Sequence, residues 1–186
     1  MLSGIRKPKN TAVFISGGGS TLQALLELRF QLNIGLVVSN KQHNLGLLKA
    51  KRSGCITYHF GKEKSYTELS KVLKSRQIEQ IFLAGYMRIL PTDFVNSWQN
   101  KIFNIHPSLL PDFAGLEATE KSFEAKGNMG VTIHKVTAEI DTGPRFLQTV
   151  SAAATCTSQM NFTEAQFFLR RSEQHLLREF AYRRAV

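Results

Sequence analysis

The sequence is short of the features that mark secreted and membrane proteins. It holds two cysteines in 186 residues, Cys55 and Cys156, too few for a disulfide framework and without the paired spacing of a zinc site. We therefore expect two buried thiols in a reducing compartment. Residues 1–9 are basic but lack the apolar segment of a signal peptide, and no run approaches the roughly 20 apolar residues that a membrane span needs. These shortages predict a cytoplasmic protein without a membrane segment.

Acidic residues are also scarce, with 14 Asp and Glu against 24 Lys and Arg, which gives a formal net charge of +10. Such an excess favours an anionic partner: a phosphorylated metabolite, a polycarboxylate or a nucleic acid. The basic residues are dispersed apart from the pairs Arg170-Arg171 and Arg183-Arg184, and no nucleic-acid recognition motif accompanies them. We expect a small-molecule partner and no nucleic acid.

Short apolar runs alternate with helical patterns along the whole chain. Runs with few polar interruptions, as in strands covered on both faces, occupy residues 11–16, 34–39, 81–85 and 103–105. Weaker strand patterns occupy residues 56–60, 131–136 and 145–150, and the short turn between the last two predicts an antiparallel pair. The alternation predicts one α/β domain over residues 1–186, a doubly wound, mostly parallel twisted sheet with helices on both faces. Residues 1–10 are expected to be a flexible extension.

Four helices are expected between and after these strands. One follows Ser20, another opens with a Ser65…Glu68 capping box, and a third has Pro91 in its first turn. The fourth runs from Asn161 with a broad apolar stripe that predicts docking on the core. Its stripe consists of Phe162, Phe168, Leu169, Leu176, Leu177 and Phe180.

A glycine loop, residues 15–21, follows the first strand and opens the first helix. Its glycines allow the backbone N–H groups and the helix N-terminus to converge on an anion, to which Ser20 and Thr21 add hydroxyls. The spacing fits neither the dinucleotide fingerprint nor a Walker loop. A plain strand-to-helix turn with a serine N-cap explains the loop equally well.

A second group of polar residues follows the fourth strong run. Asn104 and His106 project to the same face of a strand, because side chains alternate, and Pro107 ends that strand. Asp141 lies in a later turn-rich segment that can deliver a carboxylate. Taken singly, His106 reads as a core histidine and Asp141 as a turn residue. Asn104 and His106, side by side at the carboxyl end of a strand, are poorly suited to a core and well suited to chemistry.

Three segments, residues 83–90, 104–111 and 141–144, resemble the formyltransferase family in order and spacing. The resemblance extends from about Thr11 to about Glu179 and implies a Rossmann-like formyltransferase fold. It implies transfer of the formyl group of 10-formyltetrahydrofolate to phosphoribosylglycinamide in de novo purine biosynthesis, without a metal, and it is compatible with a homodimer. The glycine loop, Pro107 and the absence of a further domain favour that acceptor over those of other family members.

The resemblance also implies residue roles. The catalytic residues it implies are Asn104, His106 and Asp141. The acceptor-binding residues it implies are Gly19, Ser20, Thr21, Pro107 and Glu173. The folate-binding residues it implies are Met87, Arg88, Ile89, Leu90, Ala138, Glu139 and Ile140, together with Asn104 and Asp141. For Glu173, an exposed position on a charged helix is the alternative.

These residue types suit direct transfer. The acceptor amine attacks the formyl carbon, and Asn104 with a protonated His106 stabilises the oxyanion, each such donor lowering the barrier by on the order of 3 kcal/mol. His106 then acts as general acid, worth roughly 10²- to 10⁴-fold. Asp141 favours the cationic histidine if it lies within about 4–6 Å, and it is the candidate acceptor for the amine's proton.

Three positions depart from the family pattern. Thr21 replaces an asparagine, Asp112 a basic residue and Glu117 a histidine. Glu117 either contacts His106 or Asp141 or is solvent-exposed. Two alternatives stay open. One is a formyltetrahydrofolate deformylase, a member of the same family in which water replaces the amine. The other, which these departures support, is a catalytically weak protein that binds folate or nucleotide.

Overall fold

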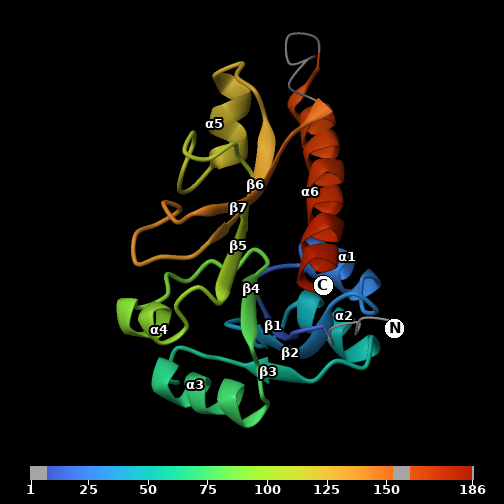
Figure 1. Cartoon of the computed structure of the whole chain (residues 1–186). Helices are drawn as coiled ribbons and strands as arrows, with labels where there is room; N and C mark the ends of the chain where they lie inside the picture. The colour runs from blue at the N-terminus through green and yellow to red at the C-terminus, as the bar shows by residue number, and fades with distance from the viewer. Residues whose placement is uncertain (1–7, 153–159, 186) are drawn as a thin grey trace, which may run out of the picture.

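A computed structural model describes residues 8–152 and 160–185 of the chain (Figure 1). Residues 1–7, most of the expected extension, and Cys156 lie outside the described residues, while Asn10 begins the first strand. The strands are β1 (Asn10–Ile15), β2 (Asn33–Ser39), β3 (Thr57–His59), β4 (Gln80–Leu83), β5 (Ile102–His106), β6 (Gly130–Lys135) and β7 (Arg145–Val150). The helices are α1 (Ser20–Glu27), α2 (Leu45–Arg52), α3 (Tyr66–Ser75), α4 (Thr92–Ser97), α5 (Ala118–Glu124) and α6 (Phe162–Ala185).

All seven strands join one sheet in the order β3-β2-β1-β4-β5-β6-β7. The first five strands of the chain pair in parallel, and β6 and β7 pair antiparallel, β6 against β5 and β7 against β6. The expected doubly wound, mostly parallel sheet and the antiparallel last pair are therefore confirmed. Strand order reverses between β1 and β4, so ligands are expected beyond the carboxyl ends of these strands.

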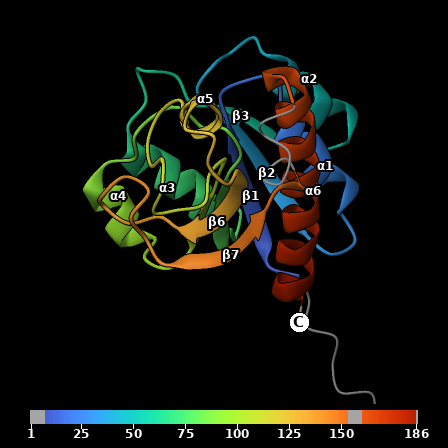
Figure 2. The ribbon, with the colours of Figure 1, turned by 90° about the horizontal axis from the view of Figure 1, so that it is seen from above.

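Helices cover the sheet on both faces (Figure 2), with α3 and α4 on one side and α1, α2 and α6 on the other. Side chains alternate along β1 and so pack into both hydrophobic cores. Ala12 and Phe14 lie in one core, and Val13 and Ile15 lie in the other. The α6 stripe docks as expected, with Leu169, Leu176, Leu177 and Phe180 buried in the second core.

Local signals set most helix starts. Ser65 accepts a hydrogen bond from the Glu68 N–H, and Glu68 accepts one from the Ser65 N–H, which forms the expected capping box of α3. Two helices were not predicted, α2 and α5. The first had a usable signal, because the Asn44 side chain caps α2 by accepting from the Leu47 N–H at 2.7 Å. The second, α5, follows the N-cap residue Glu117, which has a left-handed conformation and makes no side-chain cap bond.

Two expected helix starts differ in detail. Pro91 is the N-cap of α4 in an extended conformation, so the predicted position in the first turn is wrong by one residue. The N-cap of α1 is Gly19 rather than a serine, and it makes no side-chain cap bond. Gly19 has φ of 72°, and a Cβ there would meet the Gly46 Cα at 2.8 Å. The close approach of α2 to the loop therefore requires glycine at this position.

The C-terminal end of α6 is bonded to the centre of the sheet. Arg184 donates two hydrogen bonds to the buried Gln80 Oε1, at 2.8 and 2.6 Å, and its guanidinium stacks on Phe103 at 4.9 Å. Gln80 in turn donates to the Thr11 hydroxyl at 2.9 Å. This polar contact fixes the position at which the apolar stripe of α6 meets the sheet.

Candidate functional site

The segments after β1 and β4 meet at the point where strand order reverses. The Ser16 N–H donates to the Gly85 carbonyl at 3.2 Å, and the Ser16 hydroxyl accepts from the Met87 N–H at 2.8 Å. These bonds join the start of the glycine loop to the segment that carries Met87. The two predicted binding segments therefore lie side by side at the carboxyl edge of the sheet.

Asp141 and His106 come together at the same edge. The Oδ2 atom of Asp141 lies 3.4 Å from Nδ1 of His106, the last residue of β5. The other ring nitrogen, Nε2, lies 3.0 Å from the Phe113 carbonyl oxygen. Both nitrogens thus face acceptors, so a doubly protonated imidazole satisfies both contacts. The structure brings the predicted pair within direct contact distance.

His134 is a site residue that the sequence analysis missed. It lies opposite Asn104 in the β5–β6 pair, and its Nε2 is 3.3 Å from Asp141 Oδ1 and 3.2 Å from Asn104 Nδ2. Its Nδ1 faces the Lys135 carbonyl oxygen at 3.0 Å. The run 131–136 carried a weaker strand signal, and a polar ring within an apolar strand was the sign that could have identified His134.

Asp141 is held as a carboxylate by its neighbours. Burial favours the neutral acid, but the His134 hydrogen bond, the charge of His106 and the Gly115 N–H at 3.0 Å outweigh it and hold the pKa of Asp141 below its ordinary value. Asp141 itself adopts a left-handed conformation with φ of 54°, in the turn that the sequence analysis expected. The site therefore contains a fixed negative charge between two histidine rings.

Asn104 completes the group. Its side-chain amide donates to Asp141 Oδ1 at 3.4 Å and lies beside His134. The amide and the His106 ring therefore contact different oxygens of the same carboxylate. An amide N–H and a protonated imidazole held by one carboxylate are donors of the kind that can stabilise an oxyanion.

The glycine loop is accompanied by a cation that the sequence analysis did not single out. The Lys49 ammonium, on α2, lies 3.5 Å from the Gly19 carbonyl oxygen. Ser20 and Thr21 belong both to the loop and to the first turn of α1. The backbone N–H groups of a first turn have no intrahelical partner. The loop thus combines unpaired donors with a lysine, as an anion site requires.

Thr21 and Glu173 are in direct contact. The Thr21 hydroxyl donates to Glu173 Oε1 at 2.5 Å, which bonds α1 to the middle of α6. Burial raises the pKa of Glu173, against the opposing effects of the Thr21 hydrogen bond and of Arg170 one turn earlier. The alternative of an exposed glutamate is therefore wrong.

The expected folate-binding residues fall into two environments. Met87 and Ile89 are 74% exposed and Ile140 is 56% exposed, on the segments that flank Asn104 and Asp141. Exposed apolar side chains beside a polar site suit a flat aromatic ligand. Ala138 and Glu139 are also exposed, whereas Leu90 is buried in the core.

Arg88 has partners within the protein. Its guanidinium stacks on Phe60 and Tyr66 at 4.9 and 5.4 Å and lies 3.4 Å from the Phe60 and Gly61 carbonyl oxygens. It therefore links the segment after β4 to the segment after β3.

The remaining predicted positions are exposed. Pro107 follows the last residue of β5 and is exposed, as expected of a residue that ends the strand. Asp112 and Glu117 are also exposed, and the pKa of Asp141 carries no contribution from Glu117. Of the two readings of Glu117, solvent exposure is the one that fits.

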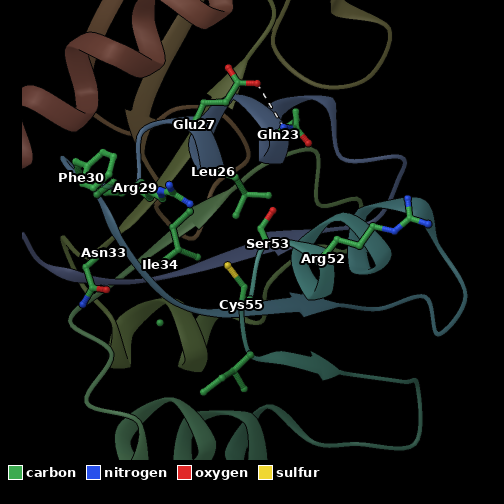
Figure 3. Close-up of a pocket in the computed structure, with 14 residues that line it drawn as sticks. Gln23, Leu26, Glu27, Arg29, Phe30, Asn33, Ile34, Arg52, Ser53 and Cys55 are labelled. Carbon is green, nitrogen blue, oxygen red and sulfur yellow. Dashed lines mark hydrogen bonds between the residues drawn. The ribbon is translucent and has the colours of Figure 1, made fainter.

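A cavity of about 780 Å³ lies at the other edge of the sheet (Figure 3). It is bounded by the end of α1, the start of β2 and the α2–β3 connection, and Figure 3 shows Arg29 facing Ser53 and Cys55 across it. Cys55 is half-buried, and burial raises the pKa of its thiol. The cavity lies at the amino end of β2, so it is separate from the catalytic group.

Within residues 8–152 and 160–185, no cluster of three or more His, Cys, Asp or Glu side chains is placed to hold a metal ion. In the same residues, no helix combines the length and apolar character that crossing a membrane requires.

Comparisons with curated proteins identify relatives of this chain. It is 37% identical over 151 residues to the phosphoribosylglycinamide formyltransferase of Haemophilus influenzae, which covers 75% of this chain and 71% of that protein. It is 41% identical over 153 residues to the trifunctional purine biosynthetic protein adenosine-3 of Drosophila pseudoobscura pseudoobscura, which covers 75% of this chain. The chain spans only 11% of the length of that larger relative.

Solved structures share the fold. The phosphoribosylglycinamide formyltransferase of Anaplasma phagocytophilum matches with a TM-score of 0.87 at 33% identity, covering 96% of this chain and 88% of that one. A formyltetrahydrofolate deformylase of Pseudomonas syringae matches with a TM-score of 0.79 at 27% identity, covering 92% and 59%. The formyl transferase family model matches residues 9–167. The expected Rossmann-like formyltransferase fold is confirmed, and the chain belongs to the formyl transferase family.

Proposed function

We propose that the protein transfers the formyl group of 10-formyltetrahydrofolate to the amine of phosphoribosylglycinamide, a step of purine biosynthesis. The observation that carries this proposal is that Asn104 and His106 both contact the Asp141 carboxylate, with His106 Nδ1 3.4 Å from Asp141 Oδ2 and Asn104 Nδ2 3.4 Å from Asp141 Oδ1. Two relatives named as phosphoribosylglycinamide formyltransferases, one 37% identical in sequence and one with a TM-score of 0.87 in structure, support the same acceptor.

The acceptor's phosphate is assigned to the glycine loop. Gly19, Ser20 and Thr21 offer backbone N–H groups at the start of α1, and Lys49 adds a positive charge beside Gly19. Glu173 lies next to this loop through its contact with Thr21. A phosphate bound here leaves the amine end of the acceptor free to reach the catalytic group.

The folate is assigned to the adjacent segments. The exposed side chains of Met87, Ile89 and Ile140 can cover the faces of a pterin ring beside Asp141. Arg88, Leu90, Ala138 and Glu139 lie on the same two segments, where Leu90 supports them from the core. Pro107 fixes the direction of the chain beyond His106.

The mechanism follows from the arrangement of donors and acceptors. The amine nitrogen bonds to the formyl carbon, and the carbonyl electrons move to oxygen. Asn104 Nδ2 and protonated His106 donate hydrogen bonds to that oxygen, His106 through Nε2–H, which leaves the Phe113 carbonyl oxygen when the substrates bind. Collapse of the tetrahedral species breaks the bond to N10 of the folate, which takes a proton from His106. Asp141, directly or through water, receives the proton that the amine loses. The proton count balances once Asp141 returns its proton to His106.

A formyl-transfer assay with both substrates tests the proposal. Wild type is expected to be active, and His106→Ala to lose roughly 10²- to 10⁴-fold in kcat, because the general acid is removed. His175→Ala, an exposed position on α6, is the matched control and should retain activity. Near wild-type turnover in His106→Ala or Asn104→Ala would reject the assignment.

The deformylase reading is the second candidate, favoured by the structural match to the Pseudomonas syringae deformylase. Formate release in the absence of the ribonucleotide would support it, since water then replaces the amine. Tight binding of both ligands by calorimetry without either reaction would instead indicate a binding protein.

Homodimer formation and a cytoplasmic location stay predictions. Light scattering in solution checks the first of them.

A further inference from the structure

The Thr21–Glu173 contact joins two distant parts of the chain. Thr21 is the last residue of the glycine loop and the second residue of α1, and Glu173 lies in the middle of α6. The Thr21 Oγ1 to Glu173 Oε1 distance is 2.5 Å, within the range of hydrogen bonds to an ionised acceptor. Both side chains are partly buried. The carboxylate is therefore held from the side of the loop.

Two features separate this contact from a surface hydrogen bond. Burial disfavours the charged form of Glu173 and raises its pKa, so keeping a carboxylate here costs stability. A neutral side chain could make the same contact with Thr21 without that cost. Leu169 and Leu176, four residues before and three after Glu173, are buried and fix α6 against its neighbours. The backbone around Glu173 is thus rigid, and its remaining freedom lies in the side chain that Thr21 holds.

We propose that Thr21 is a positioning residue for the acceptor: its hydroxyl fixes the Glu173 carboxylate beside the phosphate loop, where the second carboxylate oxygen contacts the part of the acceptor next to its phosphate. This inference rests on the proposed function for the identity of the acceptor. Thr21 thereby contributes its backbone N–H to the loop and its side chain to Glu173.

The charged groups around Glu173 determine the pH response. Arg170, one turn earlier on α6, lowers the pKa of Glu173, as does the Thr21 hydroxyl of α1, while burial raises it. The Lys49 ammonium, on α2, contacts the carbonyl oxygen of Gly19, two residues before Thr21 in the loop. Removing the hydroxyl deletes one of the two groups that favour the carboxylate. In Thr21→Val, the pH below which acceptor binding weakens should therefore be higher than in wild type.

Three substitutions at Thr21 test the inference. Thr21→Val keeps the shape and removes the donor, Thr21→Ser keeps the donor, and Thr21→Asn offers an amide donor on a longer side chain. A hydrogen bond to a charged group is worth about 1.5–3 kcal/mol, so the KM for phosphoribosylglycinamide should rise roughly 10- to 100-fold in Thr21→Val. Thr21→Ser should stay within about threefold of wild type. The KM for 10-formyltetrahydrofolate should stay unchanged in all three.

A second readout does not depend on activity. Carbon-detected NMR titration of the Glu173 carboxyl should give a higher pKa in Thr21→Val than in wild type, with Thr21→Ser restoring the wild-type value. An unchanged Glu173 titration in folded Thr21→Val overturns the inference whatever the enzyme's activity. A shifted titration with an unchanged acceptor KM in an active enzyme overturns it as well. Absence of formyl transfer in wild type, with the titration shifted, rejects the proposed function and leaves the positioning of Glu173 supported.

Discussion

His134 Nε2 lies 3.3 Å from Asp141 Oδ1, so the carboxylate that faces His106 is shared between two imidazole rings. Because the two oxygens are engaged on opposite sides, Asp141 cannot rotate without losing a partner. Gly115 adds a third contact through its N–H. The orientation of Asp141, and through it that of His106, therefore depends on residues outside the three that the sequence analysis assigned to catalysis.

Replacing His134 tests this dependence. His134→Asn removes the ring that faces Asp141 Oδ1 and is expected to lower kcat about 10- to 100-fold, since a hydrogen bond to a charged group is worth about 1.5–3 kcal/mol. The KM for the acceptor should change less than about threefold, because the phosphate loop is untouched. Steady-state kinetics beside the exposed control His175→Ala provide the measurement. An equal loss in both variants would contradict a role for the ring.

Asp141 should make the stability depend on acid pH. Its folded-state pKa is lowered below the unfolded value of about 3.9, so its stabilising contribution is present above that pH and is lost as pH falls through the folded pKa. The Tm of wild type should therefore fall relative to that of Asp141→Asn below about pH 4. Thermal unfolding of both proteins from pH 3 to 7 checks this. A Tm difference that is constant with pH would show that the carboxylate is not held by its neighbours.

Glu173 should act in the opposite sense. Burial raises its folded-state pKa above the unfolded value of about 4.3, so stability is greatest below that pH and declines as pH rises through the folded pKa. Glu173→Gln removes this ionisation and keeps an oxygen that accepts from Thr21. Its Tm relative to wild type should rise between about pH 4 and 8, as calorimetry at several pH values would show. A relative Tm that falls with pH would be the contrary result.

The hydrogen bonds between Arg184, at the end of α6, and Gln80 should stabilise the folded protein. Arg184→Ala leaves the fully buried Gln80 without the donors of its Oε1 atom, which should cost about 1–3 kcal/mol in the free energy of unfolding. Arg183→Ala is the control, because its ion pair with Glu179 is 3.9 Å long and exposed, worth roughly 0.5 kcal/mol. Urea unfolding of both variants gives the comparison. Equal losses in the two variants would show that the hydrogen bonds to Gln80 contribute no more than the exposed ion pair does.

Local signals in the sequence predicted the elements that depend on nearby residues. The Ser65 capping box and the run at residues 11–16 gave α3 and β1, because a cap or a buried strand is determined within a few residues. The start of α5 was not predictable in this way. Glu117 offers no side-chain cap, and its left-handed backbone is set by the loop that also brings Gly115 to Asp141.

The sequence by itself determined that this is an α/β protein with a glycine loop after its first strand and with Asn104, His106 and Asp141 in the order of the formyltransferase family. Only the tertiary structure decided that His134 shares Asp141, that Lys49 reaches Gly19, and that Thr21 holds Glu173. The reason is that periodicity and caps act over a few neighbouring positions. The register between β5 and β6, and the packing of α6 on α1, are set by interactions across the whole core.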